Sequence, residues 1–491
     1  RLERWAKEDP SRAAHKYKED GQWNEISARE FRDRVYYLAL YFESQGMTAR
    51  DVGCILSPNN HQWVTTELAF ALLGGKSAGL YPNSIAKDIQ YILNHSEARF
   101  LAVKDQEFFD KVLGDKKEHP LPDRIQRVLV FVGGTSVHPK SVTYEQALAE
   151  GKKMAESGGR SFDSVLENVK PETGSFIIYT SGTTGSPKGA VLTQDNLAYT
   201  ANIAVKTWDL PYSTGETFSF LPFCHIAEKI QNVGVALTQR YTVYFATKFD
   251  AVSAELPEVK PSLLLSVPRL WEKMMEGVLA KVKNSPPPRK QLMQWALGVG
   301  ERVARAKYAG TKPSILDLAT LPIADKLVLS KVRAALGLPK PHTIASGAAP
   351  LPAYVSKWFR SVGLEILEDF GQTESTGVIC MTQRGVESAG TVGKPVQGIE
   401  FKIAEDGELL TKGRHVFQGY FKDEATTREA LSSDGWLHTG DLGEWSPEGL
   451  VKIRGRKKEI MKSSGGKMVA PLPIEEKLKT NDIISQVCLV G

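Results

Sequence analysis

An eleven-residue stretch, residues 179–189, constrains this chain more than any other part of it. It reads Tyr-Thr-Ser-Gly-Thr-Thr-Gly-Ser-Pro-Lys-Gly, and from its second residue onward it holds three glycines, five hydroxyl side chains and one lysine. Glycine allows the backbone to approach an anion closely, and successive N–H groups in such a turn form an anion-binding nest. The stretch therefore predicts a phosphate-binding loop. The candidate binding residues are Thr180, Ser181, Gly182, Thr183, Thr184, Gly185 and Lys188.

The segments on either side of the loop are apolar. Residues 176–179 predict a buried strand, and Thr193 is a suitable cap for a helix that begins near Gln194. The loop is not a Walker A motif, which requires Gly-Lys-Ser/Thr, because Pro187 precedes the lysine and a glycine follows it. A flexible Gly/Ser/Thr turn is the ordinary alternative. The unbroken pattern with its lysine favours phosphate binding.

The composition is that of a globular protein with several domains. The chain has 491 residues, 42% of them hydrophobic and 24% charged, which predicts two to four domains. Its net charge of +5 is too small to indicate a nucleic-acid-binding protein, but it permits contact with an anionic membrane surface. The scattered cysteines and histidines predict no structural zinc and a reducing, cytoplasmic compartment. We find no apolar run long enough to span a membrane.

Alternating helical and strand-like segments predict parallel α/β sheets. Residues 28–44 have apolar side chains at helical spacing, residues 52–56 and 127–132 predict buried strands, and residues 63–73 predict a helix. In the second half, a proline-rich break precedes a helix predicted over residues 291–309. Further on, a strand is predicted at residues 364–367, and short strands near 407–410 and 416–420 indicate a β-rich lobe.

Two turns that follow predicted strands carry the chemistry of a nucleotide site. The small residues at 347–349 permit a flat ring to lie against the backbone, although a tight strand-to-helix turn explains them equally well. In the second turn, the ring of Phe370 can stack on a nucleobase and Thr373 can bond a phosphate oxygen. Glu374 is a hard oxygen ligand that suits Mg²⁺ held between protein and phosphates.

Three further parts of the sequence have an ordinary interpretation that must be weighed against a functional one. Asp441 is predicted to lie in a tight turn, where it either accepts both hydroxyls of a ribose or only forms the turn. His225 is predicted to end a strand, where a lone histidine ordinarily makes a structural hydrogen bond. The basic run at 453–460, predicted to lie between strands, is by default a solvated linker.

These motifs, in this order, resemble those of the AMP-forming adenylating enzymes, which include acyl-CoA synthetases, luciferases and peptide-synthetase adenylation domains. Five motifs carry the resemblance: the phosphate loop, the Gly-Ala-Ala turn, Phe-Gly-Gln-Thr-Glu, Trp-X-X-Thr-Gly-Asp and the basic run. The insertion before residue 309 and the stretch at 470–476 resemble the long-chain fatty acyl-CoA synthetases.

The resemblance implies a domain organisation. Residues 1–455 would form a large N-terminal domain of two α/β sheet lobes and a β-rich lobe. Residues 456–491 would contain the hinge and the start of a small, mobile α+β C-terminal domain. Lys458 occupies the hinge position, where many relatives have Asp, and Gly465, Gly466 and Lys467 match the loop of the thioester step. No residue matches the C-terminal lysine of the family, so we expect a truncated version.

The resemblance also implies a reaction and the residues that perform it. The substrates would be a fatty acid, ATP and coenzyme A, with Mg²⁺ as cofactor. Lys188, His225 and Glu374 would be catalytic, with Thr184 and Glu374 at the metal, and His225 would border the carboxylate-substrate pocket. The implied nucleotide-binding residues beyond the loop are Gly347, Ala348, Ala349, Asp369, Phe370, Gly371, Gln372, Thr373, Asp441 and Arg456.

Two alternatives remain open on the sequence. A fatty acyl-AMP ligase would pass its acyl group to a carrier protein, and only the acceptor differs. A non-catalytic relative would keep the ATP and lipid sites without turnover. A peptide-synthetase domain is less favoured, because its amino-group-binding aspartate has no clear counterpart here.

Overall fold

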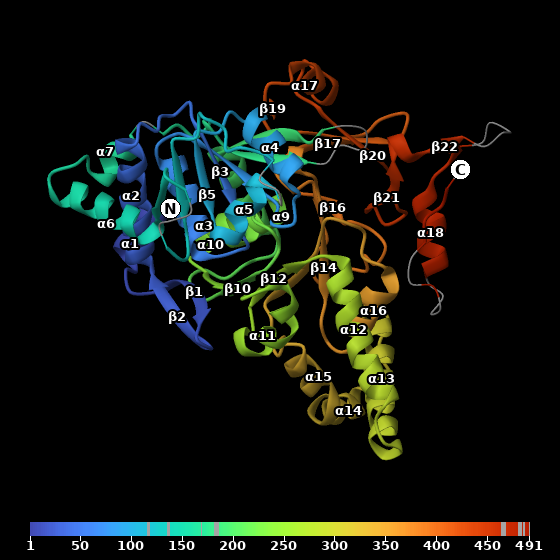
Figure 1. Ribbon diagram of the computed structural model, residues 1–491. Helices are drawn as coiled ribbons and strands as arrows, with labels where there is room; N and C mark the ends of the chain where they lie inside the picture. The colour runs from blue at the N-terminus through green and yellow to red at the C-terminus, as the bar shows by residue number, and fades with distance from the viewer. Residues whose placement is uncertain are drawn as a thin grey trace. The chain divides into compact units, whose positions relative to one another are not determined.

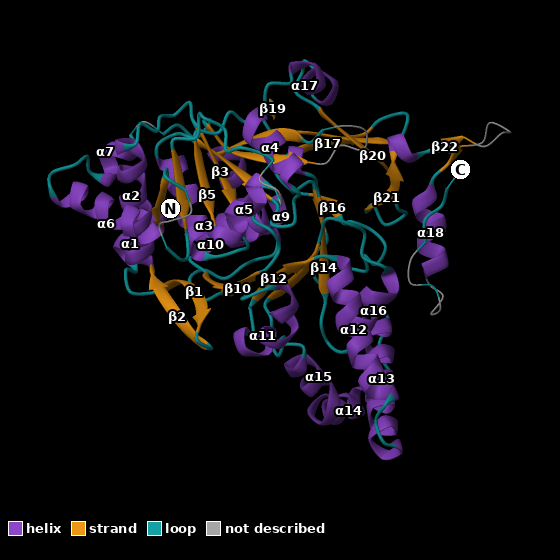
Figure 2. Ribbon diagram, viewed as in Figure 1, coloured by secondary structure: helices purple, strands orange, loops and turns teal. Residues whose placement is uncertain are grey.

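The computed structural model describes residues 1–114, 118–134, 138–167, 169–180, 186–462, 468–479, 484 and 487–490 (Figures 1 and 2). The chain divides into two compact units. The first unit comprises Arg1–Asn202, Pro211–Val252 and Phe417–Thr427, and the second comprises Ile203–Leu210, Ser253–Val416 and Arg428–Gly491. Each unit combines helices with parallel and antiparallel strands, as predicted for an α/β chain.

The first unit contains an eight-stranded sheet in the order β19-β9-β8-β4-β3-β5-β6-β7 and a four-stranded run in the order β10-β11-β1-β2. Its strands are β1 (Ala13–Glu19), β2 (Gln22–Ser27), β3 (Val52–Leu56), β4 (Lys76–Leu80), β5 (Phe100–Val103), β6 (Arg127–Val130), β7 (Ser141–Thr143), β8 (Gly174–Thr180), β9 (Lys188–Thr193), β10 (Glu216–Ser219), β11 (Thr242–Phe245) and β19 (Gly419–Tyr420). Its helices are α1 (Leu2–Glu8), α2 (Ala28–Ser44), α3 (His61–Leu72), α4 (Ala86–His95), α5 (Gln106–Leu113), α6 (Tyr144–Glu156), α7 (Phe162–Leu166), α8 (Gln194–Thr207), α9 (Ile226–Lys229), the π-helix η1 (Ile230–Val235), α10 (Ala236–Gln239) and η2 (Phe249–Ala251).

The second unit contains the run β16-β15-β14-β13-β12, the four-stranded antiparallel sheet β17-β18-β20-β21 and the pair β22-β23. Its strands are β12 (Leu263–Ser266), β13 (Thr343–Ser346), β14 (Ile366–Phe370), β15 (Cys380–Met381), β16 (Lys394–Pro395), β17 (Glu400–Ile403), β18 (Glu408–Lys412), β20 (Leu437–Trp445), β21 (Val451–Arg456), β22 (Met461–Lys462) and β23 (Met468–Val469). Its helices are α11 (Val252–Val259), α12 (Pro268–Lys283), α13 (Pro287–Tyr308), α14 (Ile315–Ala324), the π-helix η3 (Asp325–Leu329), α15 (Ser330–Ala335), α16 (Ala353–Ser361), η4 (Thr373–Ser375), η5 (Lys457–Glu459) and α18 (Pro471–Lys479). Helix α17 (Glu424–Ala430) begins in the first unit and ends in the second.

The core of the first unit follows the apolar pattern of the sequence. Every residue of β3 is buried, and β3 pairs in parallel with both β4 and β5. Helix α2 covers residues 28–44 as predicted, and its cap, Ser27, accepts a hydrogen bond from the Glu30 N–H at 3.2 Å. Helix α3 begins before the predicted residue 63, because Asn60 Oδ1 caps the Trp63 N–H at 2.7 Å.

Three other predicted boundaries shift. Strand β6 ends at Val130, two residues early, and β14 covers Ile366–Phe370 instead of residues 364–367. Helix α13 begins at Pro287, inside the predicted break, because proline fits the first turn of a helix, where its missing N–H has no partner to bond. Among the described residues, no helix has the length and apolar character needed to cross a bilayer.

The β-rich lobe exists as the antiparallel sheet of the second unit, but one segment predicted for it lies elsewhere. Strand β19 pairs with β9 in the first unit, where Gly419 and Tyr420 lie opposite Val191 and Ala190. Residues 416–420 were predicted as a short strand, without a pairing partner. The partner, β9, is far away in the sequence and is selected by packing in the folded protein, which residues 416–420 alone do not encode.

Candidate active site

A cavity of about 630 Å³ lies in the second unit. Its walls come from the turns after β13 and β14, from the paired strands β20 and β21, from α18 and from residues 488–490. Seven predicted nucleotide-binding residues from distant parts of the sequence line this one cavity: Ala348, Ala349, Asp369, Phe370, Gly371, Asp441 and Arg456.

The turn after β13 presents two small side chains. Gly347 is buried, and a Cβ atom there would lie 3.3 Å from the carbonyl oxygen of Asp369, so the turn packs closely against β14. Ala348 and Ala349 are exposed at the cavity wall, and Ala348 has a φ of +67°. A left-handed alanine costs roughly 1–2 kcal/mol, so the turn holds a strained conformation beside the cavity.

The turn after β14 requires its glycine. A Cβ atom on Gly371 would lie 2.3 Å from the backbone of Gly377, which no larger residue can tolerate. Gln372 Nε2 donates a hydrogen bond to the Thr439 carbonyl at 3.4 Å, and this bond links the turn to β20. Phe370 lines the cavity and packs against the apolar cluster that contains Val392, Leu409 and Val451.

Asp369 carries an unusual carboxyl group. It lines the cavity, and its Oδ1 is buried with no hydrogen-bond partner among the described residues. Burial raises the pKa of Asp369 well above its usual range. Burial therefore favours the protonated form of this carboxyl group, which can donate a hydrogen bond to a polar ligand.

Glu374 and Thr373 lie in the short helix η4 and are buried. The negative charge of Glu374 helps to raise the pKa of Asp441, so the two carboxyl groups interact. Within the described ranges, no three His, Cys, Asp or Glu side chains form a group that could hold a metal. One carboxylate fits Mg²⁺ that takes its remaining ligands from water and substrate phosphates.

Asp441 lies within strand β20, so the predicted tight turn was wrong. Gly440 adopts a φ of +70° and donates its N–H to Glu408 Oε1 at 2.9 Å, but the backbone continues in the sheet, with Asp441 opposite Arg456 of β21. Thr439 Oγ1 accepts the Asp441 N–H at 3.0 Å. The local Thr-Gly-Asp signal for a turn is overridden by strand pairing.

The Asp441 carboxylate is almost completely buried, and its Oδ1 lies 2.9 Å from Arg456 Nε. The pKa of Asp441 is raised to about 6, chiefly by burial. The charge of Arg456 lowers this pKa, and the charges of Glu374, Glu459 and Glu408 add to the rise. The pair places an acceptor and a donor side by side at the cavity. This arrangement suits a diol next to an anionic group.

The basic run is not a linker between strands, as its default interpretation supposed. Residues 453–456 lie in β21, and Lys457 forms ion pairs with Asp406 at 2.6 Å and with Glu408 at 2.9 Å. Lys458 follows in η5 and is exposed. Its role as a hinge stays a prediction.

The phosphate loop belongs to the first unit, and its central residues, 181–185, lie outside the described part of the chain. Its two ends are described: Thr180 and Lys188 lie opposite each other in the antiparallel pair β8 and β9. Lys188 Nζ lies 5.6 Å from the centre of the Tyr420 ring. Thr193 caps α8 as predicted, accepting the Asn196 N–H at 2.9 Å. The described ends of the stretch therefore lie in paired antiparallel strands, and β9 leads into α8.

His225 does not end a strand, as was predicted. Strand β10 ends at Ser219, and His225 caps α9, where its Nδ1 accepts the Ala227 N–H at 3.3 Å. Burial lowers the pKa of His225, so the imidazole is neutral at neutral pH. Gly79 permits this segment to pack against β4, since a Cβ atom there would lie 2.9 Å from the Cα of Cys224.

A buried polar network behind His225 was missed in the sequence. Glu228 is buried and accepts hydrogen bonds from Asn59 at 3.0 Å, from Ser219 at 2.5 Å and from Asn232 at 2.7 Å. Asn59 also binds the loop backbone, donating to the Leu221 carbonyl and accepting the Phe223 N–H. Burial raises the pKa of Glu228 to about 8. The available signal was the cluster of polar residues at 228–232, which lies between apolar segments of the sequence.

The loop predicted for the thioester step, Gly465, Gly466 and Lys467, lies outside the described residues, as do Ser181, Gly182, Thr183, Thr184 and Gly185. Their roles stay predictions.

Comparison with known proteins identifies the family. The profile of the AMP-binding enzyme family matches residues 2–421. The chain is 32% identical over 490 residues to the long-chain-fatty-acid–CoA ligase ACSBG2 of Xenopus laevis, covering 96% of this chain and 65% of that protein. It is also 32% identical to the long-chain-fatty-acid–CoA ligase FadD15 of Mycobacterium bovis, covering 99% of this chain and 78% of that protein.

The fold has solved counterparts. The structure of o-succinylbenzoate coenzyme A synthetase from Bacillus subtilis with ATP and magnesium aligns with a TM-score of 0.70 at 20% identity, covering 99% of this chain and 85% of that one. The chain thus spans about two thirds of the Xenopus relative and most of the bacterial structure. By the match of its sequence, this chain belongs to the AMP-binding enzyme family.

Proposed function

We propose that this chain carries the adenylating part of a long-chain fatty acid–CoA ligase. The observation that carries the proposal is the cavity on which seven predicted nucleotide-binding residues converge, with Asp441 and Arg456 paired at its wall. The curated relatives named as long-chain-fatty-acid–CoA ligases supply the substrate class.

In the first half-reaction, a fatty acid carboxylate oxygen attacks the α-phosphorus of ATP, and the bond to the bridging oxygen breaks as pyrophosphate leaves. Asp441 accepts the ribose hydroxyls, Arg456 neutralises nearby negative charge, and Phe370 stacks on adenine beside Ala348 and Ala349. Thr180, Lys188 and the loop between them hold the β- and γ-phosphates. Such a reaction is accelerated chiefly by positioning and charge neutralisation.

The metal and the acyl group have their own residues. Glu374, with Thr184, would hold Mg²⁺, which neutralises charge on the phosphates when it is bound. Neutral His225 would border the carboxylate pocket, and Asn59, which is bound to Glu228, holds the backbone of the preceding loop at Leu221 and Phe223.

In the second half-reaction, the coenzyme A thiol attacks the acyl carbonyl, and AMP leaves as the thioester forms. Rotation at Lys458 would bring Gly465, Gly466 and Lys467 to the site, a domain-scale step of the kind that often limits turnover.

The described free cysteines, three of them buried, suit a reducing cytoplasm.

The test is ATP–pyrophosphate exchange that depends on added fatty acid, measured over a series of chain lengths with this chain and with a longer version of the protein. We expect exchange with long acyl chains, and AMP release that needs coenzyme A. Asp441→Ala should abolish exchange, whereas Asp434→Ala, which removes an exposed carboxylate, should not. If exchange occurs but AMP is released only when a carrier protein is present, the acyl acceptor is the carrier protein and not coenzyme A. If both versions bind adenosine but neither catalyses exchange, the proposal that this protein is a ligase is refuted.

A further inference from the structure

Helix α14 in the second unit has an inverted amphipathic pattern. A helix on the surface of a globular protein normally turns its apolar stripe inward. Here the exposed fractions are 87% for Ile315, 71% for Leu316, 51% for Leu318 and 53% for Ile323, and Leu327 in the following π-helix is 42% exposed. Only Asp317 and Ala324 of α14 are buried.

The inward side is fixed by polar contacts, so the outward apolar face is a stable feature of the structure. Asp317 forms an ion pair with Arg302 of α13 at 2.7 Å and accepts a hydrogen bond from Ser314 Oγ at 2.7 Å. Its backbone N–H bonds the same serine, which caps the helix. Asp325 is held in turn by Arg333 at 2.7 Å. These contacts set the rotation of α14 and direct its apolar face away from α13.

The apolar side chains are concentrated here. Five of the twenty large hydrophobic residues exposed in the described chain fall within residues 315–327, and most of the others are scattered. Scattered exposed apolar residues are ordinary, but a contiguous group indicates an interaction surface. Figure 1 shows α14 beside α13 and α15 in this unit.

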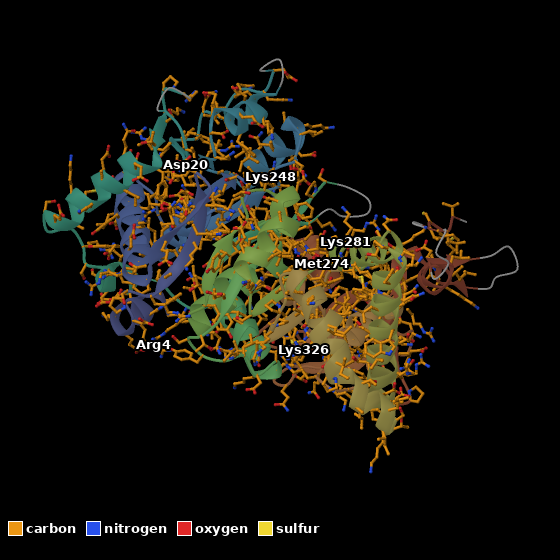
Figure 3. All side chains as sticks on the ribbon, turned by 90° about the horizontal axis from the view of Figure 1, so that it is seen from below. Arg4, Asp20, Lys248, Met274, Lys281 and Lys326 are labelled. Atoms are coloured by element: carbon orange, nitrogen blue, oxygen red, sulfur yellow. The ribbon has the colours of Figure 1, made fainter. Side chains whose placement is uncertain are left out.

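The segment that contains α14 is rich in basic residues. Residues 281–340 contain twelve Lys and Arg against three Asp and Glu, a net charge of +9, whereas the entire chain has a net charge of only +5. Asp317, Asp325 and Glu301 each pair with an arginine, so the net charge of the segment comes from its eight lysines and Arg289. Lys312 and Lys326 flank the apolar residues directly and are exposed, and Figure 3 labels Lys326.

We propose that α14 is a docking surface for a bilayer that contains anionic lipids, with Ile315, Leu316 and Ile323 inserted among the acyl chains and Lys312 and Lys326 at the headgroups. A short apolar helix flanked by lysines combines apolar burial with attraction to anionic headgroups. A second copy of the chain would bring a face of the same positive charge against this one. The core of a protein interface is depleted in lysine.

The test is flotation with vesicles of 70:30 phosphatidylcholine and phosphatidylglycerol, compared with vesicles of pure phosphatidylcholine at the same lipid concentration. The triple variant Ile315→Ser/Leu316→Ser/Ile323→Ser should lower binding to the mixed vesicles about tenfold. Lys312→Ala/Lys326→Ala should also lower it about tenfold at low salt, and the difference from the unchanged protein should shrink as salt rises. The changed side chains are exposed, so adenosine affinity and melting temperature should not change.

Matched controls come from the first unit. Ile85→Ser/Phe249→Ser removes exposed apolar groups, and Lys87→Ala/Lys248→Ala removes exposed lysines, without touching α14. Both should leave vesicle binding unchanged. The proposal fails if the triple variant floats as well as the unchanged protein, if either control lowers flotation equally, or if the mixed vesicles bind no more protein than pure phosphatidylcholine. It also fails if the triple variant changes only the oligomeric state without lipid, which would make α14 a contact between copies.

Discussion

Asp441 is at once a buried carboxyl group and a proposed ligand for ribose, and these two properties conflict. Burial and three neighbouring acids favour the protonated form, whereas Arg456 favours the ionised form. The result is a pKa of about 6, within reach of ordinary assay conditions. A carboxyl group needs its charge to retain Arg456 and to accept two hydroxyl hydrogens.

Nucleoside binding should therefore weaken in acid. With a pKa of about 6, nearly all Asp441 is ionised at pH 7 and only about a tenth of it at pH 5, so adenosine affinity should fall about tenfold over that range. Adenosine is the correct probe, because its ribose has no titrating phosphate. Calorimetry from pH 5 to 8 measures the profile.

Asp441→Asn should bind adenosine weakly at every pH and give a flat profile. Asp434→Asn, at an exposed position in the preceding turn, should retain the profile of the unchanged protein. A flat profile in the unchanged protein would contradict the assignment of the pKa to this site.

At the scale of elements, the position of α9 depends on Glu228. The carboxyl group collects three side-chain donors, and Asn59 connects it to the loop that precedes His225. Because the pKa of Glu228 is about 8 in the folded protein and about 4 in an unfolded chain, the folded protein holds this proton more tightly. The free energy of unfolding should then fall as the pH rises from about 4 to about 8.

Glu228→Gln removes this titration and keeps one acceptor oxygen. Its free energy of unfolding relative to the unchanged protein should therefore increase between pH 5 and pH 8, by on the order of a few kcal/mol. Urea denaturation at several pH values measures the difference. The exposed Glu276→Gln should show no such trend. Parallel pH profiles for Glu228→Gln and the unchanged protein would show that Glu228 titrates normally.

Elements whose apolar pattern is complete within the segment could be predicted from the sequence. Helix α2 and strand β3 have the predicted boundaries because periodicity and burial coincide there. Elements defined by their partners could not be predicted. Asp441 is in a strand because β20 pairs with β18 and β21, and residues 419–420 pair with β9, which is more than two hundred residues earlier in the chain.

The candidate site shows the same limit. Turns with special residues, such as Gly371 and Phe370, could be found because their chemistry is local. The Glu228 network could not, because Asn59 and Glu228 meet only in the folded chain. The exposed apolar face of helix α14 could not be predicted for a different reason. Periodicity indicates an apolar stripe on a helix, but it does not tell which side of the helix faces the protein.

At the scale of the whole molecule, each of the two units contains some of the residues predicted to bind the nucleotide. The residues predicted to bind adenine and ribose line a cavity of the second unit, whereas the described ends of the phosphate loop belong to the first. AMP and pyrophosphate, the two nucleotide-derived products of the overall proposed reaction, can therefore be tested as separate ligands.

Hydrogen exchange should resolve this division. AMP should slow amide exchange in the turns after β13 and β14 and along β20 and β21, because binding raises the cost of local opening there. Pyrophosphate should instead slow exchange at the start of β9 and in the adjoining loop. The hairpin of β1 and β2, which carries no predicted ligand, is the internal control and should exchange at the same rate with either ligand. If AMP protects only the first unit, or protects β1 and β2 as strongly as β20, the adenine and ribose assignments are wrong, even where the exchange assay detects activity.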